Sequence, residues 1–343
     1  MSHLAREIAE QPRVVAALLH AEAAVADDIA GRIRAHDPAF VMIAARGSSD
    51  NAARYAQYLF GDLLRLPVAL AAPSLFTLAG ARPRLGQGLV LGISQSGQSP
   101  DVVAVVEAGR DQGALTVAVT NDGQSPLARA AAHVLQIHAG VERSVAASKT
   151  YTASLAALAL IATSAIAEAG ERRRALGALR RAPELIERSL EMSADPVAQA
   201  AADWPRAARA VVLGRGFNYA TAHEIALKLG ELAYISAEAY SSAEFRHGPI
   251  AKVAPDLPLL AVTGDGPFDA DVAALAAELR ASGAWLVTLG APDADLPAAP
   301  APAPWLAPFA AVAPGQLLAM TLAGRQRRDI DSPRGLSKVT RTR

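Results

Sequence analysis

The sequence contains no cysteine, and this absence removes several kinds of chemistry at once. Disulfide bridges, zinc sites with thiolate ligands and cysteine nucleophiles are all excluded within these 343 residues. An excess of charge is also missing, because 33 basic residues balance 33 acidic ones. No nucleic-acid or membrane partner is therefore indicated. The first residues, among them Arg6, Glu7 and Glu10, lack the apolar core of a signal peptide.

Clusters of metal ligands and a dinucleotide fingerprint are absent as well, so the sequence predicts neither a metal nor an organic cofactor. The most apolar run, 150–168, approaches the length of a membrane span. It is rich in alanine rather than leucine and is flanked by Lys149, Glu168 and Glu171, which favours a buried helix. We expect a cytoplasmic protein, with enough hydrophobic residues (52%) for one large or two medium domains.

One polar turn follows an apolar run that predicts a buried strand over 89–93. The turn carries Ser94, Gln95, Ser96 and Ser99, and a helical pattern opens at Pro100. Hydroxyls and backbone N–H groups at a helix N-terminus bind anions, so the turn is a candidate phosphate site. It has no lysine and a single glycine, which excludes a nucleotide P-loop. An ordinary polar turn between a strand and a helix is the alternative.

A second turn of the same kind follows the apolar run Phe40–Ala44. It carries Gly47, Ser48 and Ser49, and a helical pattern continues to about Leu59. In a parallel α/β sheet, ligands bind where the carboxyl ends of neighbouring strands meet helix N-termini. The two serine-rich turns are therefore expected to close on one phosphate.

An internal repeat with an offset of 169 residues predicts the architecture. The tripeptide 45–47 (Ala-Arg-Gly) recurs at 214–216 as Gly-Arg-Gly, and the strand-and-turn pattern of 89–97 recurs at 258–266. The run 115–119 recurs at 284–288, and Phe76 maps onto Phe245. We predict an α/β protein with two tandem domains, each a parallel sheet flanked by helices in a flavodoxin-like or Rossmann-like three-layer sandwich. The expected segments are an N-terminal helical segment (1–34), a first domain (35–170), a helical linker (171–200), a second domain (201–324) and a C-terminal tail (325–343).

The two copies differ in the side chains that matter for chemistry. Asp265 stands where the first copy has Ser96, and a carboxylate repels a phosphate. The second copy instead gains titratable groups, namely Lys228, Glu231, Glu238, Glu244 and His247. The first copy is therefore expected to bind the phosphate, and the second to perform proton transfer.

Several motifs together resemble the SIS (sugar isomerase) domain family. They are the Ser-Gln-Ser-Gly turn at 94–97, the Arg-Gly-Ser-Ser turn at 46–49 and the run Val-Ala-Ala-Ser-Lys-Thr at 145–150. The stretch 231–249, which contains Ser-Ser-Ala-Glu-Phe and His-Gly-Pro, and the tail 331–338 resemble the isomerase half of glucosamine-6-phosphate synthase. They are also similar to SIS-type glucosamine-6-phosphate deaminases. The resemblance implies that Val145 and Ala147 lie at the substrate site.

The resemblance also implies catalytic roles. Glu231, with Lys228 one helical turn before it, would move a proton between C1 and C2 of the sugar. His247 would serve ring opening and be supplied by the neighbouring subunit of a homodimer. Lys338 would form a Schiff base with the sugar ketone, in a tail that acts as a lid. Read without the resemblance, these residues suit a solvated helical pair, a structural turn histidine and a disordered basic tail.

The expected reaction converts glucosamine 6-phosphate and water to fructose 6-phosphate and ammonia. With no cysteine, these residues are not expected to take nitrogen from glutamine, whereas release of ammonia needs only water. Three alternatives remain open: a fructosamine-6-phosphate deglycase, a glutamine-independent aminotransferase/isomerase and a phosphosugar-binding regulator without catalysis.

Overall fold

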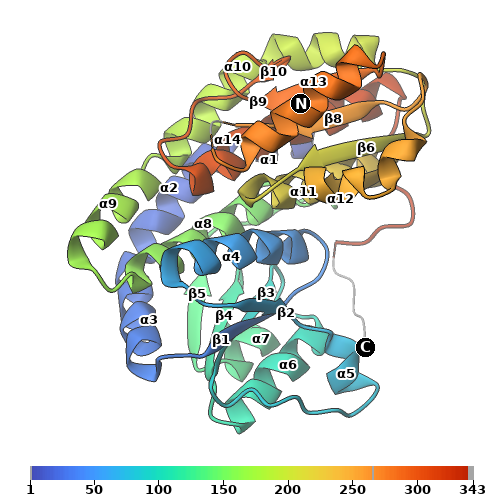
Figure 1. The fold of residues 1–343 in the computed structure, drawn as a ribbon. Helices are drawn as coiled ribbons and strands as arrows, with labels where there is room; N and C mark the ends of the chain where they lie inside the picture. The colour runs from blue at the N-terminus through green and yellow to red at the C-terminus, as the bar shows by residue number, and fades with distance from the viewer. Residues whose placement is uncertain (1, 265, 339–343) are drawn as a thin grey trace. The chain divides into compact units, whose positions relative to one another are not determined.

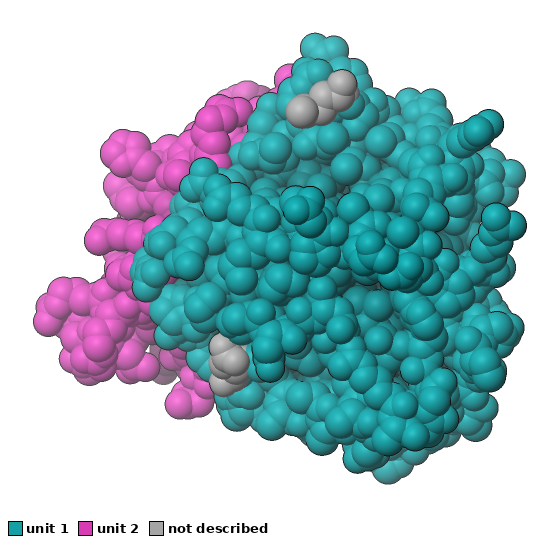
Figure 2. All heavy atoms as spheres, turned by 90° about the horizontal axis from the view of Figure 1, so that it is seen from above, with its two compact units in different colours: residues 1–12, 143–148, 181–336 teal, residues 13–142, 149–180, 337–343 magenta. Residues whose placement is uncertain are grey.

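The computed structural model describes residues 2–264 and 266–338, and within them the chain forms two parallel five-stranded sheets (Figure 1). Two compact units contain one sheet each and are coloured separately in Figure 2. Unit 1 comprises residues 1–12, 143–148 and 181–336, and unit 2 comprises residues 13–142, 149–180 and 337–343. The predicted α/β class with two parallel sheets is confirmed.

Unit 2 has the strand order β2-β1-β3-β4-β5. Its strands are β1 (Phe40–Ala44), β2 (Val68–Leu70), β3 (Gly88–Ser94), β4 (Leu115–Thr120) and β5 (His133–Gln136). Its helices are α3 (Ala23–His36), α4 (Ser48–Leu64), α5 (Pro73–Thr77), α6 (Pro100–Asp111), α7 (Pro126–Ala130), α8 (Lys149–Ala165) and α9 (Ala169–Leu179), and most of α2 (Gln11–Ala21) belongs to it. Helices α3, α4 and α8 pack on one face of the sheet, and α6 and α7 pack on the other (Figure 1).

Unit 1 has the equivalent strand order β10-β9-β8-β6-β7. Its strands are β6 (Arg209–Gly214), β7 (Ser236–Ser241), β8 (Leu259–Val262), β9 (Leu286–Gly290) and β10 (Leu296–Pro297). Its helices are α1 (His3–Ala9), α10 (Ala182–Asp203), α11 (Phe217–Ala233), α12 (Ser242–Arg246), α13 (Asp269–Ala281) and α14 (Ala307–Arg325), with 3₁₀ turns at Pro249–Lys252 and Pro304–Leu306.

Alternation along β6 shows how this sheet separates two apolar cores. Val212 packs with α11 and α14, whereas its neighbours Val211 and Leu213 pack on the opposite face with α13. Successive side chains of a strand point to opposite faces, so a strand covered by helices on both sides is apolar throughout. The continuous run of valine and leucine in β6 is therefore the sequence signal of a central strand.

The repeat is reproduced by the backbone with the predicted offset. Helix α11 begins and ends 169 residues after α4, and α12 does the same relative to α5. Gly47 and Gly216, which precede α4 and α11, have φ of 55° and 59°. Such a backbone conformation suits glycine, which lacks a Cβ atom. The correspondence ends after β4 and β9, because β10 has two residues and α14 does not begin at the offset of α8.

Two details differ from the sequence prediction. Helix α4 begins at Ser48 and continues to Leu64 rather than to about Leu59, so Ser48 and Ser49 lie in its first turn. The predicted linker 171–200 is divided, because α9 lies in unit 2 and α10 in unit 1. The predicted domain boundaries stay predictions, and Asp265 and 339–343 lie outside the described residues.

The alanine-rich helix α8 is buried along its whole length, as its sequence predicts. In the described part of the chain, one helical segment, Pro304–Arg325, is long and apolar enough to cross a membrane by length and composition. Its most apolar window is 78% buried inside the structure, where α14 packs against α10 and α11. Burial of that kind is typical of a core helix.

Candidate functional site

The two serine-rich turns of unit 2 lie at the point where the strand order reverses. The chain passes from β1 outward to β2 and then crosses back to β3, which pairs with the other edge of β1. Ala44 at the end of β1 is in register with Gly92, so the two turns that follow β1 and β3 leave the same edge of the sheet. Parallel α/β sheets bind ligands in the crevice at such a reversal.

The turn after β3 is held in one conformation by its own hydrogen bonds. The N–H of Gly97 donates to Oγ of Ser94 at 3.1 Å, and the N–H of Gln98 donates to Oγ of Ser96 at 3.3 Å. Gly97 has φ of 62°, and a Cβ atom there would collide with the side chain of Ser125. Ser99 precedes α6 without making a side-chain capping hydrogen bond. This glycine is therefore required both by the backbone and by the available space.

The turn after β1 places Ser48 and Ser49 at the N-terminus of α4. The N–H groups of Ser49 and Asp50 donate to the carbonyls of Arg46 and Gly47, and the positive end of the helix dipole lies at this turn. The guanidinium of Arg46, in the turn after β1, is paired with the buried carboxylate of Asp101, in the first turn of α6, at 2.7 Å. This ion pair connects the two serine-rich turns. Burial raises the pKa of Asp50 in the same helical turn, against the opposing charges of Arg54 and Arg46.

In unit 1 a carboxylate of the chain itself lies at the equivalent place. Asp269, at the N-terminus of α13, is 5% exposed and accepts a hydrogen bond from the N–H of Gly266 at 2.9 Å. Its other oxygen accepts from Nδ2 of Asn218 at 3.3 Å. The first copy has Pro100 at this position. Asp265 is the carboxylate predicted from the sequence to repel phosphate here; that residue lies outside the described residues, and the structure adds Asp269 as a carboxylate bound in the same turn.

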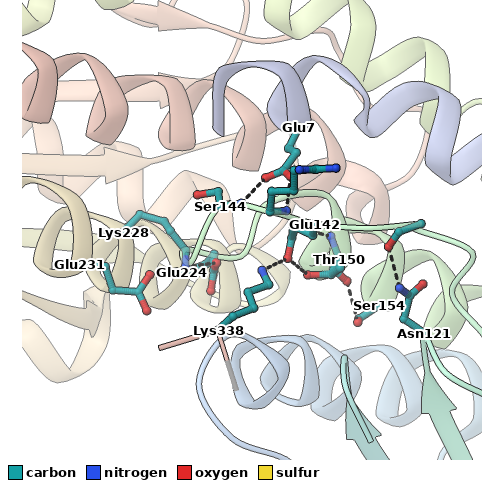
Figure 3. A network of polar contacts seen from close by, with 12 residues as sticks. Glu7, Asn121, Glu142, Ser144, Thr150, Ser154, Glu224, Lys228, Glu231 and Lys338 are labelled. Atoms are coloured by element: carbon teal, nitrogen blue, oxygen red, sulfur yellow. Dashed lines mark hydrogen bonds and ion pairs between the residues drawn. The ribbon is translucent and has the colours of Figure 1, made fainter. Parts of the chain in front are cut away.

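A buried charge cluster lies on α11 of unit 1 (Figure 3). Lys228 is 1% exposed, and its Nζ lies 2.5 Å from a carboxylate oxygen of Glu231. It also lies 3.4 Å from the fully buried carboxylate of Glu224. Lys228 is therefore not part of a solvated helical pair, and the Glu231 carboxylate, 22% exposed, is the member of the cluster open to solvent.

Helix α4 of unit 2 has a different set of side chains at the same three positions. Tyr55 and Leu59, both fully buried, correspond to Glu224 and Lys228 at the offset of 169. Asp62, which corresponds to Glu231, pairs with Arg65 on the surface at 3.7 Å. The fold therefore accepts uncharged residues at the inner two positions, and the charges of α11 are specific to unit 1.

His247 is placed apart from this cluster. It ends α12, its backbone N–H donates to the carbonyl of Glu244 at 3.0 Å, and the residue is exposed. Among the described residues, its imidazole makes no hydrogen bond or ion pair.

Hydrogen bonds from Lys252 and Tyr240 lower the pKa of Glu238, so this carboxylate stays charged as half of a surface ion pair.

Another ion pair of unit 1 ties α12 and α13 to the turn after β6. Asp271, in the first turn of α13, accepts hydrogen bonds from Ser242 and from Arg215. These two bonds, the one from Ser242 first, lower the pKa of Asp271.

In the described ranges 2–264 and 266–338, no three His, Asp or Glu side chains gather as metal ligands would.

Lys338 is held by a buried carboxylate of unit 2 (Figure 3). Its Nζ lies 2.5 Å from a carboxylate oxygen of Glu142, whose side chain is fully buried. The same carboxylate accepts from the hydroxyl of Thr150 at 2.7 Å and from its N–H at 3.1 Å. This ion pair attaches the tail to unit 2 at Lys338.

The loop that carries Val145 and Ala147 is fixed within unit 1. The buried carboxylate of Glu7 on α1 accepts from the N–H groups of Arg143 and of Ser144, the latter at 3.2 Å. The N–H of Val145 donates to the carbonyl of Asp331 at 3.1 Å. Val145 and Ala147 are half-buried.

Four carboxylates in these arrangements were not singled out from the sequence: Glu7, Glu142, Glu224 and Asp269. Glu224 could have been found, because it lies four residues before Lys228 on a helix. Glu142 could not, since its partner Lys338 is 196 residues away along the chain. Acidic residues are mostly exposed, so the sequence alone predicts exposure for these carboxylates. Only the structure shows that they are buried.

The chain is similar to known proteins over most of its length. The SIS domain family matches residues 37–164 and 206–291. Glutamine–fructose-6-phosphate aminotransferase (isomerizing) from Thermus thermophilus is 36% identical over 312 residues, which cover 87% of this chain and 51% of that protein. The chain thus spans about half the length of such relatives.

Two solved structures show the same fold over nearly the whole chain. The C-terminal domain of glucosamine-fructose-6-phosphate aminotransferase from Francisella tularensis has a TM-score of 0.87 and 26% identity, covering 97% of this chain and 98% of that one. Glucosamine-6-phosphate deaminase from Thermotoga maritima has a TM-score of 0.82 and 22% identity, covering 99% and 100%.

Proposed function

Because the chain belongs to the SIS domain family, we propose that it is an aminosugar-phosphate deaminase/isomerase. The reaction converts glucosamine 6-phosphate and water to fructose 6-phosphate and ammonia. The observation that carries the proposal is the charge cluster of Lys228, Glu224 and Glu231, which α11 has and α4 lacks. Burying a lysine and two carboxylates costs desolvation free energy. Ionisable groups that a protein buries at such a cost are often found at functional sites.

The phosphate is proposed to bind at the crevice between β1 and β3. Ser49, Ser94, Ser96 and Ser99 offer hydroxyls there, with Gln95 and the N–H groups of Gly47 and Ser48 nearby. The phosphate is carried on C6, so C1 and C2, at the other end of the open-chain sugar, remain accessible for proton transfer. Val145 and Ala147 are proposed to line the same site.

The chemistry is a proton transfer followed by hydrolysis. Glu231 takes the proton from C2 and returns it to C1, and one proton of the C2 amine passes to O1. The C1 aldehyde thereby becomes an alcohol and the C2 amine becomes an imine. Lys228, charged and at 2.5 Å, holds the Glu231 carboxylate in place. Water then adds to C2, the C–N bond breaks, and ammonia leaves.

Lys338 is proposed to speed the last step. Its amine attacks C2 of the imine and expels ammonia, and water afterwards releases fructose 6-phosphate and regenerates the amine. Glu142, at 2.5 Å from Nζ, is placed to take the proton that Lys338 loses before the attack. His247 is proposed to open the sugar ring from a neighbouring copy in a homodimer, which suits its exposure. A cytoplasmic location is part of the same proposal.

Ammonia release from a panel of sugars tests the proposal. Glucosamine 6-phosphate, galactosamine 6-phosphate and a fructosamine 6-phosphate are offered to the wild type, to Glu231→Gln and to the matched control Asp62→Asn. We expect release from an aminohexose 6-phosphate, lowered about 10²-fold or more by Glu231→Gln and unchanged by Asp62→Asn. Release from the fructosamine alone would favour the deglycase, and binding without turnover would favour a regulator.

Exchange of substrate protons with deuterated water checks the role of Glu231 separately. The wild type should exchange the proton at C1 or C2, and Glu231→Gln should not. Exchange at the native rate in that variant would show that Glu231 is structural. Borohydride reduction with fructose 6-phosphate should leave an adduct on Lys338, and a fully active Lys338→Ala enzyme would refute both a covalent role and a lid.

A further inference from the structure

Residues 328–334, where the C-terminal tail begins, fold around the ring of Tyr234. The guanidinium groups of Arg328 and Arg334 lie over the ring of Tyr234, at 4.7 and 4.9 Å from its centre. The N–H of Arg334 also donates to Oη of Tyr234 at 2.9 Å. Guanidinium groups at such distances are attracted to the ring face. Two residues six positions apart therefore bind the same side chain, and the chain between them forms a turn around it.

Asp331, at the middle of that turn, provides a second attachment within unit 1. Its carboxylate accepts from the N–H of His3 at 2.9 Å and from the N–H of Leu4 at 2.8 Å, where α1 begins. Its carbonyl accepts from Val145. The N–H groups at a helix start need acceptors, and a carboxylate is the strongest that a side chain offers.

Tyr234 is the residue that ends α11, three positions after Glu231. Its φ is 55°, a left-handed conformation that an aromatic residue rarely adopts. Arg65 ends α4 with nearly the same φ, 59°, and pairs only with the surface residue Asp62 among the described residues. The backbone of the two copies is thus the same, and the ring that binds the tail is present in unit 1 only.

We propose that Tyr234 is a positioning residue for Lys338. It fixes residues 328–334 to the end of the helix that carries Glu231, so that the tail leaves this attachment on a defined path and Lys338 follows four residues later. Asp331 supports the same turn from its other side. The inference rests on the proposed function, because it gives Lys338 a covalent step that needs exact placement.

Tyr234→Leu and Tyr234→Phe test the inference, with Arg65→Leu as the matched control at the same backbone conformation. Tyr234→Leu removes the ring and the acceptor, and we expect the kcat of ammonia release to fall at least tenfold. KM and exchange at C1 and C2 should stay within about twofold of wild type, because the phosphate turns and Glu231 are untouched. Tyr234→Phe keeps the ring and should recover most of the loss, and Arg65→Leu should behave as wild type.

A second measurement does not depend on turnover. Hydrogen exchange of the backbone over 328–336 should be faster in Tyr234→Leu and close to wild type in Tyr234→Phe. If Tyr234→Leu does not fold, Asp331→Asn weakens the same turn and should show the same separation of ammonia release from proton exchange. Unchanged ammonia release and unchanged hydrogen exchange in Tyr234→Leu would overturn the inference, as would equal loss of both catalytic steps. A wild type that releases no ammonia would instead refute the proposed function.

Discussion

Replacing Lys228 with methionine tests how the charges on α11 are held inside the protein. Methionine has a similar length but no charge, so the fully buried carboxylate of Glu224 loses the ammonium group 3.4 Å away. Breaking a buried ion pair by removing one partner typically costs about 3–5 kcal/mol, because the other charge stays desolvated. For a unit of this size we expect Tm to fall by roughly 6–20 °C.

The double variant Glu224→Gln/Lys228→Met separates charge from packing. It keeps side chains of similar size and leaves no unpaired charge at the inner two positions. Exchanging a buried ion pair for uncharged residues is often neutral or stabilising, so the double variant should be more stable than Lys228→Met alone. Tyr55 and Leu59 show that the equivalent helix of unit 2 packs well without charges there.

Urea unfolding followed by circular dichroism measures both variants, and ammonia release is measured in parallel. We expect the double variant to recover stability but not activity, since Lys228 no longer holds Glu231. A Lys228→Met protein that unfolds at the same urea concentration as the wild type would refute the reasoning. So would a double variant that is less stable than the single one.

Three further substitutions test other parts of the structure. Ser96→Ala should weaken binding of phosphorylated sugars by about 1.5–3 kcal/mol, measured as KM or by calorimetry, and should lower Tm only slightly, because one weak hydrogen bond of the turn is lost with the hydroxyl. Gly97→Ala should destabilise unit 2 by more than Gly113→Ala, because both have positive φ but only Gly97 has no room for a Cβ atom; equal losses of Tm would contradict this. The pKa of Asp271 is lowered in the folded state, so its contribution to stability is present above about pH 4 and is lost as the pH falls through the lowered value. The pair is partly exposed, so Asp271→Asn should reduce the acid dependence of urea unfolding by about 1 kcal/mol or less.

The arrangement of elements could be predicted where the signal is local or repeated. Strand β1 was predicted over its observed range, and the offset of 169 gave the correspondence of α4 with α11. Both rest on hydrophobic patterns and on turn residues that act over a few positions. The end of α4 was missed by five residues, because Gly61 favours an earlier end, whereas the helix continues through it to Leu64, three residues before Pro67.

Residue burial and distant contacts could not be predicted in the same way. The spacing of Lys228 and Glu231 gives a helical pair whether it is solvated or buried, and only the packing of α11 against α14 shows that Lys228 is enclosed. The pairing of Lys338 with Glu142 depends on the course of the tail. Asp269 was missed because a fixed offset aligns it with Pro100, whereas its side chain reaches back to Gly266.

The two copies have the same backbone conformation at matched positions but carry different functional side chains there. Gly47 and Gly216 precede equivalent helices with nearly the same φ, yet in unit 1 the carboxylate of Asp269 accepts from the N–H of Gly266, in the turn that corresponds to the proposed phosphate turn of unit 2. The N–H of Gly266, in the turn before α13, is therefore satisfied by a side chain of unit 1 itself. Removing the carboxylate alone does not restore the hydroxyls of the first copy, so Asp269→Asn would free a donor set too poor to hold a phosphosugar. The proposed phosphate site therefore depends on the serine-rich turn, which unit 2 has and unit 1 lacks.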